Sequence, residues 1–217
     1  NYTLFIDQTP FNNLFDDYQA KTQKNTNGFL VERVVDEGKK DIVVSKINKE
    51  LFGQSNFKTE LSKRLNYFTF LHQIKKKRIF SIFLLGGTGL GKTETAKIIN
   101  NALNQENKLV KINFGNYTSK DAVNSLIGSP LGYVGSNEGG ELVRKLKNNQ
   151  SGIILCDEFE KADKSVAYFF LELMEDGSFT DSKGDEHDLD GYIVIFTSNL
   201  NKQKYFSTIP PEFHTRL

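Results

Sequence analysis

One glycine-rich segment constrains this chain more than any other feature. Gly86-Gly-Thr-Gly-Leu-Gly-Lys-Thr93 matches the pattern G-x-x-x-x-G-K-[ST] at every fixed position. An apolar stretch at 79–85 precedes it, and a stretch with helical periodicity at 93–104 follows it. Glycines let successive backbone N–H groups point inward at phosphate oxygens, and the helix N-terminus adds the positive end of its dipole. The segment therefore predicts a strand, a loop and a helix that together hold nucleotide phosphates.

Two side chains at the end of this loop carry its chemistry. Lys92 is predicted to place an ammonium group on the outer phosphates, and Thr93 to offer a hydroxyl to Mg²⁺. The expected cofactors are therefore ATP or ADP together with Mg²⁺. The other loop residues expected to contact the nucleotide are Gly87, Thr88, Gly89, Leu90 and Gly91.

A second apolar stretch, 152–156, ends in two acids, Asp157 and Glu158. Ligands gather at the carboxyl ends of parallel strands, so these acids are expected to lie beside the phosphate loop. Asp157 is predicted to hold Mg²⁺ directly or through water. Glu158 is predicted to polarise the attacking water.

Apolar strand-like stretches alternate with amphipathic helical ones from residue 47 onward. This alternation predicts an α/β fold with a mostly parallel sheet covered by helices on both faces. Expected helices are 55–77, 93–104, 120–127, 140–148 and 165–175; expected strands are 79–85, 109–114, 152–157 and 192–197, with a hairpin turning at 176–177 and 183–184. Residues 1–46 are rich in Asn, Asp, Thr and Gln. They are interpreted as an N-terminal extension or linker with two short strands, 29–35 and 41–44.

Composition excludes several classes of function. Lys and Arg number 28 against 27 Asp and Glu, a net charge of +1, which argues against a partner held mainly by phosphate neutralisation, such as DNA. The single cysteine, Cys156, excludes an internal disulfide and a cysteine-built zinc site. The longest apolar stretch is too short to span a membrane, and no signal segment is seen. A reducing, cytoplasmic location is expected.

Together these motifs resemble the AAA+ family, specifically the Clp-type (ClpA/ClpB-like) protein unfoldases and disaggregases. The resemblance covers about 47–217 in order and implies the large, nucleotide-binding subdomain of an AAA+ module. It ends at the arginine finger, so the C-terminal helical lid of the family is missing from the expected fold. The matching segments are Leu51-Phe-Gly-Gln54, Phe83–Glu94, Leu155-Cys-Asp-Glu-Phe-Glu-Lys-Ala162, Leu173–Asp181, Phe196-Thr-Ser-Asn199 and Pro211-Glu-Phe-His-Thr-Arg216.

The resemblance adds further residues to the expected nucleotide site. It implies that Leu51 and Phe52 pack on the adenine and that Glu94 belongs to the phosphate-binding segment. Asn199 ends the strand expected beside the acidic strand, where its neutral amide can orient a water or touch the γ-phosphate. Arg216 corresponds to the arginine finger, which reaches the nucleotide of the neighbouring subunit and stabilises phosphoryl-transfer charge.

A glycine-flanked loop, Gly132-Tyr133-Val134-Gly135, resembles the central-pore loop of Clp proteins. There the tyrosine grips an unfolded chain, a task that suits a large apolar side chain with little rotamer entropy to lose. The resemblance thus implies an ATPase that threads unfolded or tagged polypeptides through a homo-hexameric ring. No nucleic-acid or membrane partner is expected. The peptidase-docking loop of the family is not seen between Asn199 and Pro210.

A second interpretation is a nucleotide-gated assembly or scaffold protein with little intrinsic hydrolysis. Without the family's lid, weak ATPase activity is expected from these residues alone. A nucleic-acid-acting AAA+ relative is a third interpretation, which the near-neutral charge disfavours.

Overall fold

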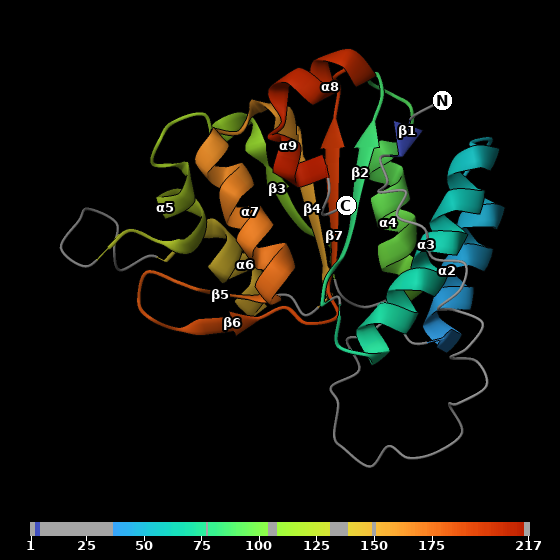
Figure 1. Cartoon of the computed structure of the whole chain (residues 1–217), viewed down its shortest axis with the longest axis horizontal. Helices are drawn as coiled ribbons and strands as arrows, with labels where there is room; N and C mark the ends of the chain where they lie inside the picture. Colours follow the sequence, from blue (N-terminus) through green and yellow to red (C-terminus); the bar gives the residue numbers. More distant parts are fainter. Residues whose placement is uncertain are drawn as a thin grey trace, which may run out of the picture.

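The computed structural model of the chain describes residues 3–4, 37–76, 78–103, 108–130, 139–148 and 151–214. Figure 1 shows a central sheet with helices on both sides. The helices are α2 (Glu37–Glu50), α3 (Ser55–Gln73), α4 (Lys92–Leu103), α5 (Ala122–Ile127), α6 (Glu141–Asn148), α7 (Lys164–Asp176), α8 (Lys202–Thr208) and α9 (Pro211–His214), with short 3₁₀ turns η1 (Phe114–Asn116) and η2 (Phe159–Lys161). The strands are β1 (Thr3–Leu4), β2 (Phe80–Leu85), β3 (Val110–Asn113), β4 (Ile153–Asp157), β5 (Ser178–Thr180), β6 (Glu186–Asp188) and β7 (Ile193–Ser198).

The main sheet has the strand order β1-β2-β7-β4-β3 within the described residues. Strands β2, β7, β4 and β3 run parallel, and β1 pairs antiparallel with β2 at the edge. Leu85 pairs with Ser198 and Asn113 with Asp157, so the carboxyl ends of the parallel strands meet at one edge. This confirms the predicted α/β fold and brings the phosphate loop and the acidic strand to the same end of the sheet.

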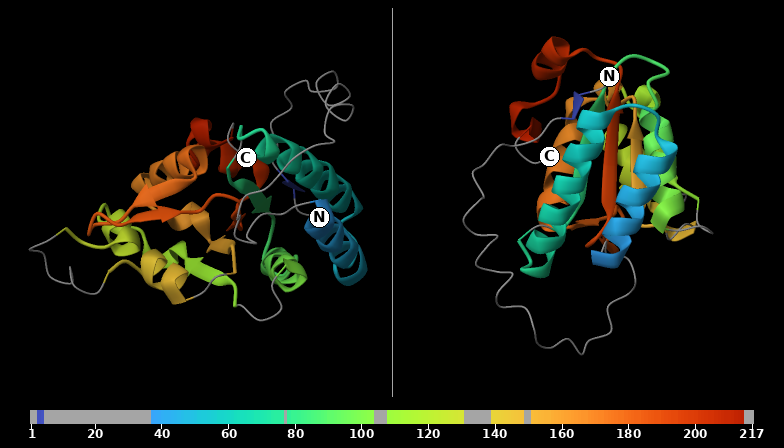
Figure 2. Two further views of the ribbon diagram at one scale, coloured as in Figure 1. Left: turned by 90° about the horizontal axis from the view of Figure 1, so that it is seen from below. Right: turned by 90° about the vertical axis from the view of Figure 1, so that its right-hand side faces the viewer.

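Helices cover both faces of the sheet. Because successive residues of a strand point to opposite faces, the central strands β2, β7 and β4 each contribute side chains to two separate hydrophobic clusters. On β2, Phe80, Ile82 and Leu84 join the hydrophobic cluster under α2, α3 and α4, whereas Phe83 and Leu85 join the cluster under α5 to α9. Strands β4 and β7 alternate in the same way. Figure 2 shows α2 and α3 lying over one face of the sheet. Such strands are nearly all apolar, which explains why the sequence predicted them well.

The strand expected at 41–44 is wrong, because these residues lie inside helix α2. Val43, Ile47 and Leu51 recur every four residues, and all three are buried against the cluster that contains α4 and β2. That spacing places them on one face of a helix, whereas a strand would divide its side chains between two faces. Helix α2 also runs across the boundary expected between residues 46 and 47. The strand expected at 29–35 lies outside the described residues.

The predicted hairpin is confirmed as β5 and β6, which pair antiparallel. The buried carboxylate of Asp181 holds its turn: Oδ1 accepts the N–H groups of Lys183 (2.9 Å) and Asp185 (3.0 Å), and Oδ2 lies 2.9 Å from His187 Nε2. Ring stacking of His187 on Phe179 adds to this packing. Among the described helices, none is long and apolar enough to cross a lipid bilayer.

Candidate active site

The phosphate loop connects β2 to α4 at the carboxyl edge of the sheet. Gly89 (φ 81°) and Gly91 (φ 88°) have left-handed backbone conformations, which glycine adopts without steric cost. A Cβ added at Gly87 or Gly89 would meet nothing within 4 Å, so open space borders the loop. Helix α4 begins at Lys92, and its first N–H groups and dipole therefore face this space.

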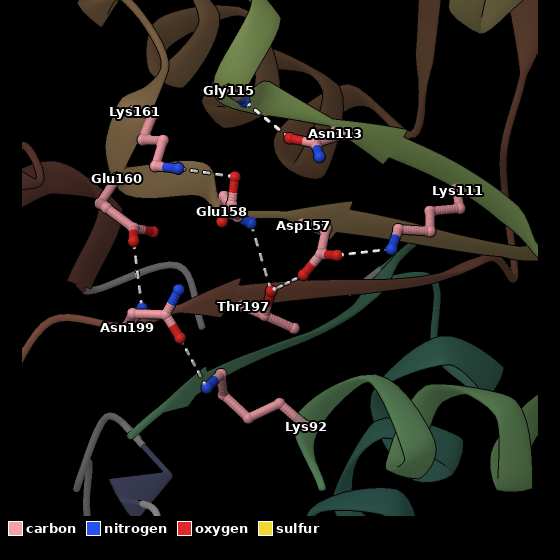
Figure 3. Close-up of polar contacts among 10 residues, drawn as sticks. All are labelled: Lys92, Lys111, Asn113, Gly115, Asp157, Glu158, Glu160, Lys161, Thr197 and Asn199. Atoms are coloured by element: carbon pink, nitrogen blue, oxygen red, sulfur yellow. Dashed lines mark hydrogen bonds and ion pairs between the residues drawn. The ribbon is translucent and has the colours of Figure 1, made fainter. Parts of the chain in front are cut away.

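Lys92 is buried, with only 7% of its surface exposed, and its ammonium turns back toward the loop. Nζ donates to the carbonyl oxygens of Gly86 (2.7 Å) and Gly87 (2.9 Å) and to Oδ1 of Asn199 (3.1 Å). Burial lowers the pKa of Lys92, while the nearby charges of Glu160 and Asp157 act in the opposite direction. The structure thus brings together two residues, Lys92 and Asn199, that are far apart in the sequence (Figure 3).

Asp157 is held by two donors at the end of β4 (Figure 3). Thr197 Oγ1 donates to Oδ1 at 2.6 Å, and the Lys111 ammonium lies 2.6 Å from Oδ2. Burial raises the pKa of Asp157, but the hydrogen bonds from Lys111 and Thr197 outweigh it, so the pKa lies below its ordinary value. The carboxylate is therefore ionised at neutral pH, the state in which it can bind a cation.

Glu158 follows immediately and turns the chain away from the strand. Its backbone is left-handed (φ 57°, ψ 41°), and its N–H donates to Thr197 Oγ1 at 3.3 Å. Its Oε2 lies 2.8 Å from the ammonium of Lys161. Gly115 packs close to this carboxylate: a Cβ added there would lie 3.1 Å from Glu158 Oε2 and 3.0 Å from Asn113 Oδ1. A side chain at residue 115 would therefore press on both oxygens, which would have to shift by a few tenths of an ångström.

The residues present fit Mg²⁺ and a nucleotide. Mg²⁺ prefers oxygen ligands and usually binds one or two carboxylates together with substrate phosphates and waters. Thr93, in the first turn of α4, supplies a hydroxyl, and Asp157 supplies an ionised carboxylate at the end of β4, which β7 separates from β2 in the sheet. The described residues contain no group of three or more His, Cys, Asp or Glu placed to hold a metal by themselves. The donor set therefore suits a cation that shares its ligands with bound phosphates.

Comparison with protein families agrees with this geometry. The AAA domain (Cdc48 subfamily) matches residues 77–212, from just before β2 into α9. The chain belongs to this AAA domain family. The match includes the phosphate loop, the acidic strand and Asn199, which are the parts that the structure brings to one edge of the sheet.

Curated relatives of this AAA domain are bacterial chaperones. The chain is 44% identical to the chaperone protein ClpB of Clostridium perfringens over 127 residues, 58% of this chain and 15% of the relative. It is 41% identical to ClpB of Enterococcus faecalis over 133 residues, which are 61% of this chain and 15% of the relative. It is 43% identical to ClpB of Staphylococcus epidermidis over 126 residues, which are 58% of this chain and 14% of the relative. The predicted Clp-type AAA+ resemblance is confirmed, over a region that is a small part of each relative.

Of the two residues expected at the adenine, Leu51 lies next to the phosphate loop of the AAA domain. Leu51 is buried, and its Cδ1 would lie 3.7 Å from a Cβ added at Gly91. Its neighbour Phe52 is 92% exposed, a large apolar ring without cover in the described part of the chain. Leu90 is also partly exposed. Glu94 points outward and pairs with Lys97 at 3.2 Å. Two expected parts, Gly132–Gly135 and Arg216, lie outside the described residues.

Four residues of the site in this AAA domain escaped the sequence-based prediction: Lys111, Glu160, Lys161 and Thr197. Thr197 could have been found, because it lies in the segment Phe196-Thr-Ser-Asn199, at the carboxyl end of the same strand that leads to Asn199. Lys111 could not, because its contact with Asp157 depends on how β3 aligns with β4.

Proposed function

We propose that this AAA domain binds ATP with Mg²⁺ and hydrolyses it. The observation that carries the proposal is the meeting of three segments at one sheet edge: Lys92 of the phosphate loop contacts Asn199, and Thr197 joins Asp157 to the backbone of Glu158. A phosphate loop, an ionised carboxylate and a second carboxylate beside it are the parts that nucleotide hydrolysis requires.

Each residue has a distinct task in the proposed reaction. Lys92 and the backbone N–H groups of the loop bind the phosphates, and Glu158 accepts a proton from the attacking water. Thr93 and Asp157 would hold Mg²⁺, which when bound would neutralise charge at the phosphates. With its Oδ1 bonded to Lys92, the Asn199 amide has its Nδ2 group left to donate to the terminal phosphate.

We further propose that the whole protein uses ATP turnover to unfold or remodel polypeptides in a hexameric ring. Similarity to ClpB chaperones supports this proposal. Tyr133 would grip the polypeptide, and Arg216 would complete the site of the neighbouring subunit. The proposed location is the cytoplasm.

A nucleotide-gated assembly protein with little hydrolysis is the second candidate. The ion pair between Glu158 and Lys161 favours it, because the Lys161 ammonium lies 2.8 Å from Glu158 Oε2 and competes with the attacking water for that oxygen. The two candidates share nucleotide binding and differ in turnover.

Titration with a fluorescent ATP analogue and a steady-state phosphate-release assay on the intact protein test these proposals. Lys92→Ala should abolish nucleotide binding, whereas Glu158→Gln should keep binding and stop hydrolysis. Hydrolysis by Glu158→Gln at the parent rate would disprove the assigned base. Binding by the parent without measurable turnover, even with casein added, would favour the assembly protein.

A further inference from the structure

Glu160 is an acidic residue at the site to which the proposed reaction gives no task. It lies in η2, directly after the left-handed turn at Glu158. Its neighbour Phe159 is fully buried, with its ring centroid 4.7 Å from that of Phe196 and 5.3 Å from that of Phe114. Phe159 thus anchors the backbone of this turn in the core, and Figure 3 shows the side chains of Glu158 and Glu160 leading from the turn to different partners, Lys161 and Asn199.

One oxygen of Glu160 holds the backbone of Asn199. Asn199 follows the last residue of β7, so its N–H lies beyond the strand. That N–H donates to Glu160 Oε1 at 3.1 Å, while the Asn199 side chain accepts from Lys92 Nζ at 3.1 Å. Asn199 is thus fixed from two sides, by Glu160 at its backbone and by Lys92 at its amide oxygen.

The second oxygen, Glu160 Oε2, is inaccessible to solvent and has no hydrogen-bond partner among the described residues. A carboxylate oxygen that is buried without a hydrogen-bond partner is unfavourable for stability on its own. The cost indicates that the side chain is needed for something other than stability, and its one strong contact is with Asn199.

We propose that Glu160 is a positioning residue of the ATPase site, which fixes Asn199 so that its side-chain amide meets the terminal phosphate. This inference rests on the proposed function. Glu160 acts through the reach of its oxygen to the Asn199 N–H. A residue with the same reach should therefore replace it, whereas one with the same charge but a shorter side chain should not.

Two conservative variants separate reach from charge. Glu160→Gln keeps the side-chain length and an acceptor oxygen, and Glu160→Asp keeps the charge but is one methylene shorter. The measurement is the affinity of the intact protein for a non-hydrolysable ATP analogue and for ADP, each with Mg²⁺. Glu172→Ala removes an exposed acid from α7 and serves as the control.

Glu160→Asp should weaken binding of the ATP analogue by roughly tenfold while ADP affinity stays within about twofold, because only the terminal phosphate contacts Asn199. Glu160→Gln and Glu172→Ala should match the parent within about threefold for both nucleotides. Both Glu160 variants change few atoms, and a thermal melt establishes that they are folded.

Three results would overturn the proposal. Parent-like binding of the ATP analogue by Glu160→Asp would show that the contact with Asn199 is dispensable. If Glu160→Gln binds the ATP analogue more weakly than the parent while Glu160→Asp binds it normally, the charge of residue 160 matters and its reach does not. A parent that binds neither nucleotide would refute the proposed function as well, so the two failures are distinguishable.

Discussion

At the scale of single residues, the site depends on how closely Gly115 approaches Glu158. A Cβ at residue 115 would lie 3.1 Å from Glu158 Oε2, close enough that the carboxylate must shift by a few tenths of an ångström. Displacements of about 1 Å in a reacting group can cost roughly a hundredfold in rate. In the proposed reaction this packing therefore helps to set the position of Glu158, the proposed base.

Gly115→Ala should lower ATP turnover by roughly five- to tenfold and leave nucleotide affinity within about twofold, because the added Cβ presses on Glu158 and Asn113 and on none of the residues proposed to bind the phosphates. Steady-state phosphate release and analogue titration measure the two quantities. Asn116→Ala, an exposed residue of the same turn, is the control. Equal turnover by Gly115→Ala and the parent would show that Glu158 is not held by this contact.

The sequence predicted the residues of the site that belong to motifs and missed those that depend on register. Lys92, Asp157 and Asn199 stand at the ends of strands or the start of a helix, where the chain order alone places them at one edge. Lys111 and Glu160 reach the site only through the alignment of β3 with β4 and the left-handed turn at Glu158. Neither feature leaves a periodic signal in the sequence.

At the scale of elements, helix α2 belongs to the hydrophobic core of the AAA domain. Ile47 is buried against the helices and strands of that core. Ile47→Ala should therefore lower the free energy of unfolding by about 2–4 kcal/mol, through lost burial and the cavity left behind. Denaturant unfolding measures the change, with the exposed Ser45→Ala of the same helix as control. If Ile47→Ala costs no more than Ser45→Ala, α2 does not contribute to the core.

This helix also shows why part of the fold escaped prediction. Val43 and Val44 are adjacent β-branched residues next to Ile42, and such a run is typical of a strand when only a few residues are considered. The helical signal emerges only when Ile47 and Leu51 are included. By contrast, β2 and β4 are almost wholly apolar and flanked by motifs, so their type and position could be predicted.

The β5–β6 hairpin should be sensitive to acid because of Asp181. Burial raises the pKa of this carboxyl, but His187 and the N–H groups of Lys183 and Asp185 lower it below the ordinary value. Ionised Asp181 thus stabilises the fold above the unfolded-state pKa of about 3.9, and the stabilisation is lost as the pH falls through the lower folded-state pKa.

Asp181→Asn should lower the free energy of unfolding by about 1.5–3 kcal/mol at pH 7, because it removes charge-assisted hydrogen bonds. The difference from the parent should shrink as the pH falls below about 4. Urea unfolding over a pH series measures it. Asp185→Asn, which loses only an exposed pair at 3.7 Å with Lys147, should change stability by less than about 1 kcal/mol. A difference that is constant with pH would assign the effect to packing.

At the scale of the whole molecule, the proposed unfoldase requires that ATP turnover and polypeptide threading be separable. The groups proposed to bind and hydrolyse ATP lie at one edge of the sheet, whereas Tyr133 belongs to a different segment of the chain, between α5 and α6. Loss of the tyrosine ring should therefore remove the grip on a substrate without changing the chemistry of the site.

Tyr133→Ala in the intact protein should keep basal ATP turnover within about twofold of the parent, while unfolding of a tagged substrate falls by at least roughly tenfold, because the proposed grip on the polypeptide depends on the aromatic ring. Light scattering establishes whether the particle is a hexamer. The increase in ATP turnover on addition of casein measures how strongly a polypeptide substrate acts on the nucleotide site. Tyr168→Ala, which removes a half-exposed tyrosine from α7, is the matched control. If both variants unfold the substrate as the parent does, the ring does not pull through Tyr133. If Tyr133→Ala also loses basal turnover, the loop acts on the nucleotide site rather than on the substrate.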